Sequence, residues 1–209
     1  MKPTSKPIWR LLWVFIGSVV CGLGIKLILL SGAGVDPLTM FEEGLSKTIG
    51  VDTGIVVWGF NMTMLVIAFF LNRKTIGWGS LVASFFIGPA VTFFGMFGIP
   101  APATFPGSIA MNVLGVVVCG LGIAIYMTPA YGVGAMEAIM MFISDRVHKT
   151  YGLVRVCMDC TWGVIGFFLG GTLGIGTIIG AFGIGTSLDL FFRGIKRFVL
   201  KEAPASQDA

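Results

Sequence analysis

Charge is the scarcest feature of this sequence. Only 11% of its 209 residues are charged, and 56% are hydrophobic. A soluble domain carries about a quarter of charged residues, so the composition excludes an ordinary soluble protein. The one histidine, His148, falls in a predicted loop, and no phosphate-binding loop, nucleophile elbow or metalloprotease helix is present. We therefore expect no enzymatic activity, no bound metal and no other cofactor.

Six apolar runs are long enough to cross a bilayer, which takes about 20 helical residues. They cover residues 11–30, 54–71, 77–99, 109–127, 153–169 and 175–192. We expect each run to be a helix, because a backbone in lipid must satisfy its own hydrogen bonds.

Two shorter segments, 36–49 and 134–147, are predicted to be helices that do not span. Asp36 suits the N-cap of the first and Pro37 suits its first position. In a helix the apolar residues of this segment share one face and the charged residues lie on another. These two sets are Leu38, Phe41 and Leu45, and Glu42, Glu43 and Lys47.

The glycine turns that open these short helices are a second point of interest. Gly34 precedes the first helix, and Gly132 and Gly134 precede the second. A helix N-terminus presents free N–H groups and a positive dipole end. Two interpretations stay open: inward-facing N-termini that bind an anionic group, or plain interfacial helices with their caps.

The chain consists of two copies of one unit. Residues 19–25 read Val-Val-Cys-Gly-Leu-Gly-Ile and recur unchanged at 117–123; the shift of 98 positions becomes 97 after a one-residue deletion. Repeat 1 covers about 11–99, a linker 100–108, repeat 2 about 109–192 and a tail 193–209 of a single membrane domain. Each repeat holds three spans, an odd number, so the copies must face opposite ways. We predict an all-α integral membrane protein of six transmembrane helices, arranged as two inverted three-helix repeats.

The lysines and arginines of the loops predict the orientation. Eleven lie on one side of the predicted membrane and only Lys47 on the other, while Lys26 and Arg155 lie within spans. The eleven are Lys2, Lys6, Arg10, Arg73, Lys74, Arg146, Lys149, Arg193, Lys196, Arg197 and Lys201. The positive-inside rule then places both termini in the cytosol. Because the positive charges lie at the ends of predicted membrane spans, we attribute the net charge of +4 to the orientation in a lipid bilayer and not to binding of nucleic acid.

Asp159 is the most informative candidate for a site, because a charge inside a span costs several kcal/mol. Its repeat mate is Asn61, so the two repeats place polar groups at equivalent depth. Arg155 stands one turn earlier, and an ion pair that only stabilises the fold is an equally good interpretation. With Asp36 and Glu137 of the short helices, these three residues are the predicted substrate-binding groups.

The four cysteines all fall inside apolar runs, at positions 21, 119, 157 and 160. We expect them to be small buried side chains rather than disulfides or metal ligands.

Four sequence features together resemble a known family. They are Gly22-Leu23-Gly24-Ile25, Gly34-Val35-Asp36-Pro37, Arg155 with Asp159, and the glycine-rich stretch 170–177. The chain resembles the YczE/YyaS/YitT-like bacterial membrane proteins, and is most similar to the YczE branch. This resemblance implies a protein of the bacterial cytoplasmic membrane and implies no established substrate.

Inverted repeats are typical of secondary transporters, which bind solute at the repeat interface. By that fold-level analogy we expect a small-solute carrier or permease of unknown substrate. Two alternatives are a membrane scaffold or accessory protein for a biosynthetic system, and the substrate-capture subunit of a larger importer. A carrier should have a polar cavity around Asn61 and Asp159, a scaffold a dry interior, and an importer subunit an ATPase partner. Assembly as a homo-oligomer stays open.

Overall fold

The computed structural model describes residues 7–73 and 75–201, and that part of the chain is entirely helical apart from its connections. It contains α1 (Pro7–Ser31), α2 (Pro37–Ile49), α3 (Thr53–Leu71), α4 (Trp78–Gly95), α5 (Phe105–Met127), α6 (Ala135–Val147), α7 (Tyr151–Phe168) and α8 (Ile175–Lys201). The predicted all-α class is confirmed, and so are both short helices. The cytosolic charges predicted at Lys2, Lys6 and Lys74 lie outside the described residues.

Five helices are long and apolar enough to cross a membrane, namely α1, α3, α4, α5 and α8. The prediction named six, and the missing one is α7. Arg155 and Asp159 lie within the first half of α7, and their charges lower its hydropathy. The chain is therefore a multi-pass membrane protein with five spans of clear composition.

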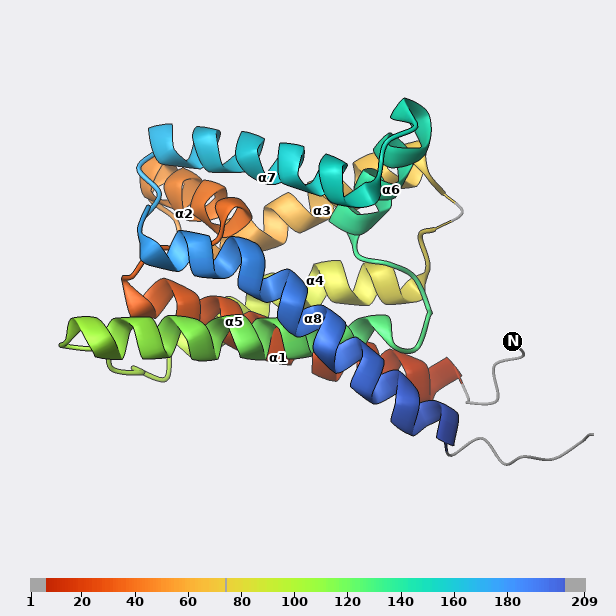
Figure 1. Ribbon diagram of the computed structural model, residues 1–209, viewed down its shortest axis with the longest axis horizontal. Helices are drawn as coiled ribbons and strands as arrows, with labels where there is room; N and C mark the ends of the chain where they lie inside the picture. The colour runs from red at the N-terminus through yellow and green to blue at the C-terminus, as the bar shows by residue number, and fades with distance from the viewer. Residues whose placement is uncertain (1–6, 74, 202–209) are drawn as a thin grey trace, which may run out of the picture.

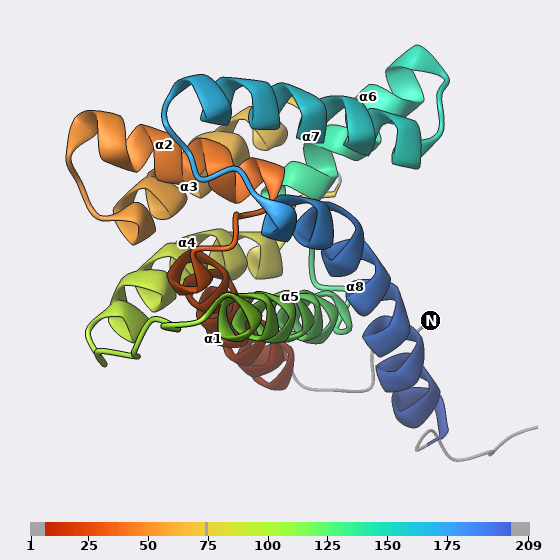
Figure 2. The ribbon, with the colours of Figure 1, turned by 60° about the vertical axis from the view of Figure 1, so that its left-hand side comes forward.

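The helices form two layers (Figures 1 and 2). One layer contains α1, α4, α5 and α8, and the other contains α2, α3, α6 and α7. Each layer holds two pairs of repeat-equivalent helices, because α1 to α4 match α5 to α8 in order. The predicted site residues Asn61, Arg155 and Asp159 all lie in the second layer.

The helices α1 and α5 form the centre of the first layer and run antiparallel. A β-carbon built on Gly17 would lie 2.5 Å from the backbone nitrogen of Tyr126, and one on Gly115 would lie 2.8 Å from that of Ile28. Gly115 is the repeat mate of Gly17, and Tyr126 is the repeat mate of Ile28. The two contacts are therefore one contact made twice with the partners exchanged, as at a two-fold interface. The small residues at these positions permit this close approach.

The connections between helices show the same exchange. The Val35 N–H donates to the carbonyl of Thr172 (3.1 Å), and the Val133 N–H donates to the carbonyl of Thr75 (3.3 Å). The turn before α2 thus binds the segment before α8, and the turn before α6 binds the segment before α4. Each repeat uses its short-helix turn to hold the other.

Several boundaries differ from the prediction; α1 begins at Pro7 rather than at residue 11, and α4 ends at Gly95 rather than at residue 99. The linker ends earlier, because Thr104 accepts a hydrogen bond from the Gly107 N–H and Pro106 stands in the first turn, so α5 begins at Phe105. At the other end α8 continues to Lys201, so the predicted tail begins as helix rather than as loop.

Large apolar side chains cover much of the outer surface. Phe70 is 82% exposed and Phe168, from the equivalent part of the second repeat, is 81% exposed. An apolar surface of this extent requires a bilayer around it.

Candidate functional site

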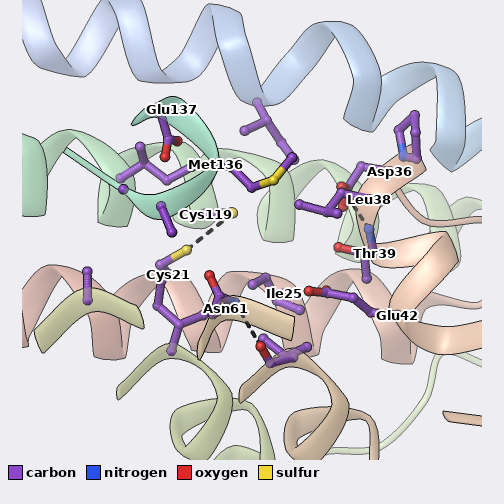
Figure 3. A pocket seen from close by; sticks show the side chains of 18 of the residues that line it. Cys21, Ile25, Asp36, Leu38, Thr39, Glu42, Asn61, Cys119, Met136 and Glu137 are labelled. Atoms are coloured by element: carbon purple, nitrogen blue, oxygen red, sulfur yellow. Dashed lines mark hydrogen bonds between the residues drawn. The ribbon is translucent and has the colours of Figure 1, made fainter. Parts of the chain in front are cut away.

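A cavity of about 130 Å³ lies between the two layers and is lined by all five predicted substrate-binding residues, Asp36, Asn61, Glu137, Arg155 and Asp159 (Figure 3). These residues come from the α1–α2 turn, α3, α6 and α7, so no short motif could have joined them. At about 30 Å³ per molecule, the cavity has room for about four waters or one small solute.

The lining of this cavity is built almost entirely from repeat mates. Asn61 faces it with Asp159, Cys21 with Cys119 and Ile25 with Ile123. The Sγ atoms of Cys21 and Cys119 are 3.7 Å apart across the α1–α5 interface. The cavity therefore lies where the two repeats meet. Cys157 and Cys160 on α7 are exposed, so the prediction of buried cysteines is wrong for that pair.

The polar pair in α7 has the predicted contact. Arg155 Nε and Asp159 Oδ2 are 3.6 Å apart, and both side chains are about a quarter exposed. The repeat mate of Asp159, Asn61, donates from Nδ2 to the carbonyl of Val57 one turn earlier (2.8 Å), which satisfies its amide within α3. The ion pair is thus partly open to the cavity.

Both short helices begin with a carboxylate. Asp36 caps α2 as predicted, accepting a hydrogen bond at Oδ2 from the Thr39 N–H (3.2 Å). At α6 a β-carbon on Gly134 would collide with Glu137 Oε2, so Glu137 folds back over the N-cap residue of its own helix, although no side chain caps α6 by a hydrogen bond. The capping interpretation therefore holds for α2, and at α6 an acid lies near the positive helix end.

Of the three predicted turn glycines, one lines the cavity and two lie away from it. Gly134 lines the cavity, whereas Gly34 and Gly132 do not. Gly34 and Gly132 have φ angles of 110° and 129°, which other residues rarely adopt. The fully buried Asn112 supports the first turn, donating from Nδ2 to the Gly34 carbonyl (2.8 Å). These two glycines shape the repeat contacts.

The sequence prediction missed Glu42. It was placed on the charged face of a surface helix, but only 2% of it is exposed, and it lines the cavity. Burial raises the pKa of this carboxyl well above its usual range, and the negative charge of Asp36 adds to the effect. Its neighbour Glu43 behaves as expected at the rim, accepting from the Thr172 N–H and pairing with Lys47 at 2.7 Å.

A second cavity of about 650 Å³ adjoins the first. Glu137 and Arg155 line both cavities, and the second extends to Ser144 and Asp145 in the last turn of α6 and to Asp189 in the middle of α8. Asp145 and Asp189 are exposed. We call this second cavity the vestibule, because it shares lining residues with the central cavity and reaches exposed residues.

The vestibule exists because the two repeats pack differently. We use seam for the contact between the last two helices of a repeat, which are α3 and α4 in repeat 1 and α7 and α8 in repeat 2. The α3–α4 seam is an extensive contact, whereas α7 and α8 barely touch. The vestibule lies between α6 and α8, beside the α7–α8 seam, and Arg155 of α7 also lines it.

Glycines show this difference most clearly. A β-carbon on Gly88 would lie 2.5 Å from the Gly54 carbonyl oxygen, and one on Gly54 would lie 2.6 Å from that of Gly88. Their repeat mates are Gly185 and Gly152. A β-carbon on either would meet no described atom within 4 Å. Gly54 and Gly88 are therefore in close contact, whereas the equivalent Gly152 and Gly185 are not.

Comparisons with known proteins give relatives over most of the chain. It is 30% identical over 176 residues to the uncharacterized membrane protein YczE of Bacillus subtilis (strain 168), covering 82% of this chain and 80% of that protein. It is 29% identical over 182 residues to an uncharacterized protein of Haemophilus influenzae (strain ATCC 51907 / DSM 11121 / KW20 / Rd), covering 85% and 81%. It is 25% identical over 190 residues to the uncharacterized protein YyaS of Bacillus subtilis (strain 168), covering 90% and 94%. No solved structure matches.

The resemblance to the YczE and YyaS proteins is therefore confirmed. Residues 8–193 also match a family described as a family of unknown function, DUF6198. That match spans all eight helices except the ends of α1 and α8. The chain thus belongs to the DUF6198 family.

Proposed function

We propose that this protein is a secondary carrier for a small solute, placed in the bacterial cytoplasmic membrane with both termini in the cytosol. It works by alternating access, and the cavity around Asn61, Arg155 and Asp159 is its solute site. It has no enzymatic activity. Six spans form two inverted repeats, and α7 is the sixth.

The reciprocal contacts of α1 and α5 support the inverted arrangement. The two helices are antiparallel, and a two-fold axis that exchanges antiparallel helices runs perpendicular to both. If both helices cross the bilayer, this axis lies in the membrane plane, as in inverted-repeat carriers.

The outer surface of α7 supports its place in lipid. Val156, Val164 and Phe168 are 58%, 57% and 81% exposed. The repeat-equivalent helix, α3, has the composition of a span. Arg155 and Asp159 turn toward the cavity and leave this apolar side to the bilayer.

The observation that carries the proposal is the unequal pair of seams. The repeats share the glycines needed for a closed seam, but only Gly54 and Gly88 are in contact. A carrier needs this difference: the site opens to one side while the other side is shut, and the two repeats then exchange conformations. With cytosolic termini, the open vestibule faces the cytosol.

Polar groups in the central cavity favour a carrier over a scaffold, for which we expected a dry interior. The third candidate, a capture subunit of an importer, requires an ATPase partner. Copurification from bacterial membranes with an ATPase would favour that candidate.

The test is side-specific labelling of a single cysteine. Ala181 is partly exposed and lines the central cavity, so Ala181→Cys is a conservative reporter in a chain whose four native cysteines are replaced. A small impermeant thiol reagent should label it from the cytosolic side of proteoliposomes in the resting state. During uptake of a transported solute, found by screening amines, amino acids and organic acids, labelling should shift to the outer side. Labelling that never reaches the outer side, together with no uptake, would end the carrier proposal.

A further inference from the structure

Glu42 is a buried acid without a partner. It is 2% exposed, and the described part of the chain offers its carboxyl no hydrogen bond and no ion pair. Figure 3 shows its carboxyl reaching toward Ile25, into the central cavity. Burying such a group without compensation is costly, so a retained one points to a ligand that completes it.

The cavity as a whole has an excess of acid. Four carboxyls line it, those of Asp36, Glu42, Glu137 and Asp159, against the single guanidinium of Arg155. That guanidinium already lies 3.6 Å from Asp159. Asp36 caps the N-terminus of α2, and the Glu137 carboxyl lies over Gly134 at the start of α6, so an acid already stands at each helix end. Each of these carboxyls that is ionised repels an anionic solute, whereas a cation bound beside a carboxyl stabilises its ionised form.

Most of the remaining lining is apolar, and it determines what kind of cation fits. Ile25 and Ile123 face the cavity from α1 and α5, and Ile87 and Ile184 face it from α4 and α8. Among the described residues, no three His, Cys, Asp or Glu side chains are grouped as metal ligands. Isoleucine walls and a volume of about 130 Å³ suit a small ion with its own apolar groups better than a hydrated metal ion.

We propose that the central cavity binds a small organic cation, a protonated amine with a short apolar chain, and that the Glu42 carboxylate is its counter-charge. The ammonium group lies between Glu42 and Asp36, and the apolar chain packs on the isoleucines. This rests on the proposed solute site, but binding is measurable without transport.

The experiment is thermal melting of the full chain in detergent, with three probes of one size and different charge: propylammonium, 1-propanol and propionate. Propylammonium alone should raise the melting temperature, by about 3–6 °C at ten times its dissociation constant. Glu42→Gln should abolish that rise. Glu43→Gln, one residue away at the rim, is the matched control and should keep it. A rise with propionate, an equal rise with 1-propanol or no rise with propylammonium would overturn the proposal.

A second measurement serves if Glu42→Gln does not fold. An apolar carbodiimide should modify Glu42 in the wild-type chain, read by mass spectrometry of the peptide. Propylammonium should protect it at least about tenfold more than propionate does. Equal modification with and without propylammonium would overturn the proposal.

Transport assays separate this inference from the carrier proposal. Propylammonium binding without uptake of any solute would contradict the carrier proposal and leave the proposed cation site standing. Uptake of a neutral or anionic solute, without propylammonium binding, would contradict the proposed cation site and leave the carrier proposal standing.

Discussion

The Thr92 hydroxyl donates a hydrogen bond to the Asp52 carboxylate and joins the last turn of α4 to the N-cap of α3. Their repeat mates are Asp189 and Thr150, the same two residue types with places exchanged. Asp189 is exposed and lines the vestibule, and Thr150 makes no side-chain cap. This hydrogen bond holds the α3–α4 seam together at one end. At the α7–α8 seam the equivalent residues, Asp189 and Thr150, are present but are not bonded to each other. In the opposite state of a carrier, Thr150 should donate to Asp189.

The first prediction compares two equivalent glycines. Gly88→Ala should destabilise the protein by about 1–3 kcal/mol, because its β-carbon would meet the Gly54 carbonyl and Trp58. Gly185→Ala has open space and should be neutral or stabilise by up to about 1 kcal/mol, through helix propensity. Detergent melting of both variants measures the difference. Equal losses would mean that the α7–α8 seam is closed in the resting protein.

The second prediction concerns the seam that has to close during transport. Gly152→Val should leave the melting temperature within about 2 °C of the wild type, since nothing described lies within 4 Å of its β-carbon. It should nevertheless abolish transport, because the closed α7–α8 seam would need that space. The Ala181→Cys reporter should then be labelled from the cytosolic side only. Normal uptake by this variant would show that the seam does not close.

The third prediction concerns Arg155 and Asp159. Asp159→Asn should destabilise by about 1–2 kcal/mol, less than the loss of about 3–5 kcal/mol for a fully buried pair, because both side chains are a quarter exposed. Adding Arg155→Gln should recover most of that loss in melting experiments. If the pair belongs to the solute site, the stable double variant should remain inactive in uptake. A double variant that is stable and active would reduce the pair to a structural role.

The fourth prediction is a pH dependence set by Glu42, whose ordinary pKa of 4.5 is raised by burial. The native state holds this proton more tightly than the unfolded state, so Glu42 contributes stability below about pH 4.5 that is lost as the pH rises through the raised value. Wild-type melting should therefore fall with rising pH more steeply than melting of Glu42→Gln. Identical slopes would mean that Glu42 does not titrate. The other titratable or charged groups of the same cavity are Asp36, Glu137, Arg155, Asp159, Cys21, Cys119 and Tyr126, and they are present in both chains.

The fifth prediction tests the orientation and the sixth span. Single cysteines at Lys149 and Lys196 should react with an impermeant reagent from the cytosolic side, and those at Ala103 and Leu173 from the outer side. Lys149 and Leu173 flank α7, and Leu173 is 59% exposed. Reaction of these two positions from the same side would mean that α7 does not cross the bilayer.

Much of the local structure follows from short stretches of sequence. The cap at Asp36 and the start of α2 at Pro37 depend only on neighbouring residues. Helices α1 and α5 follow from long apolar runs, which have one stable form in lipid. The repeat of residues 19–25 at 117–123 paired each helix with its equivalent, and so placed Asn61 and Asp159 at one depth.

Tertiary packing decided the rest. Glu42 shares a charged helix face with Glu43 and Lys47, a pattern that predicts exposure. It is buried because α2 packs against both α3 and α7, so that two faces of this short helix are covered and a polar cavity replaces water. For such a helix, amphipathicity no longer indicates the exposed side.

The seams depend on packing in the same way. Gly54 and Gly88 have the same letters as Gly152 and Gly185, so the sequence determines that both repeats are able to close. Which seam is closed is a property of the conformation, because two identical sets of contacts cannot both be made around one cavity that opens to one side. The sequence alone therefore determined that the chain consists of two equivalent units, and only the tertiary structure decided where their packing differs.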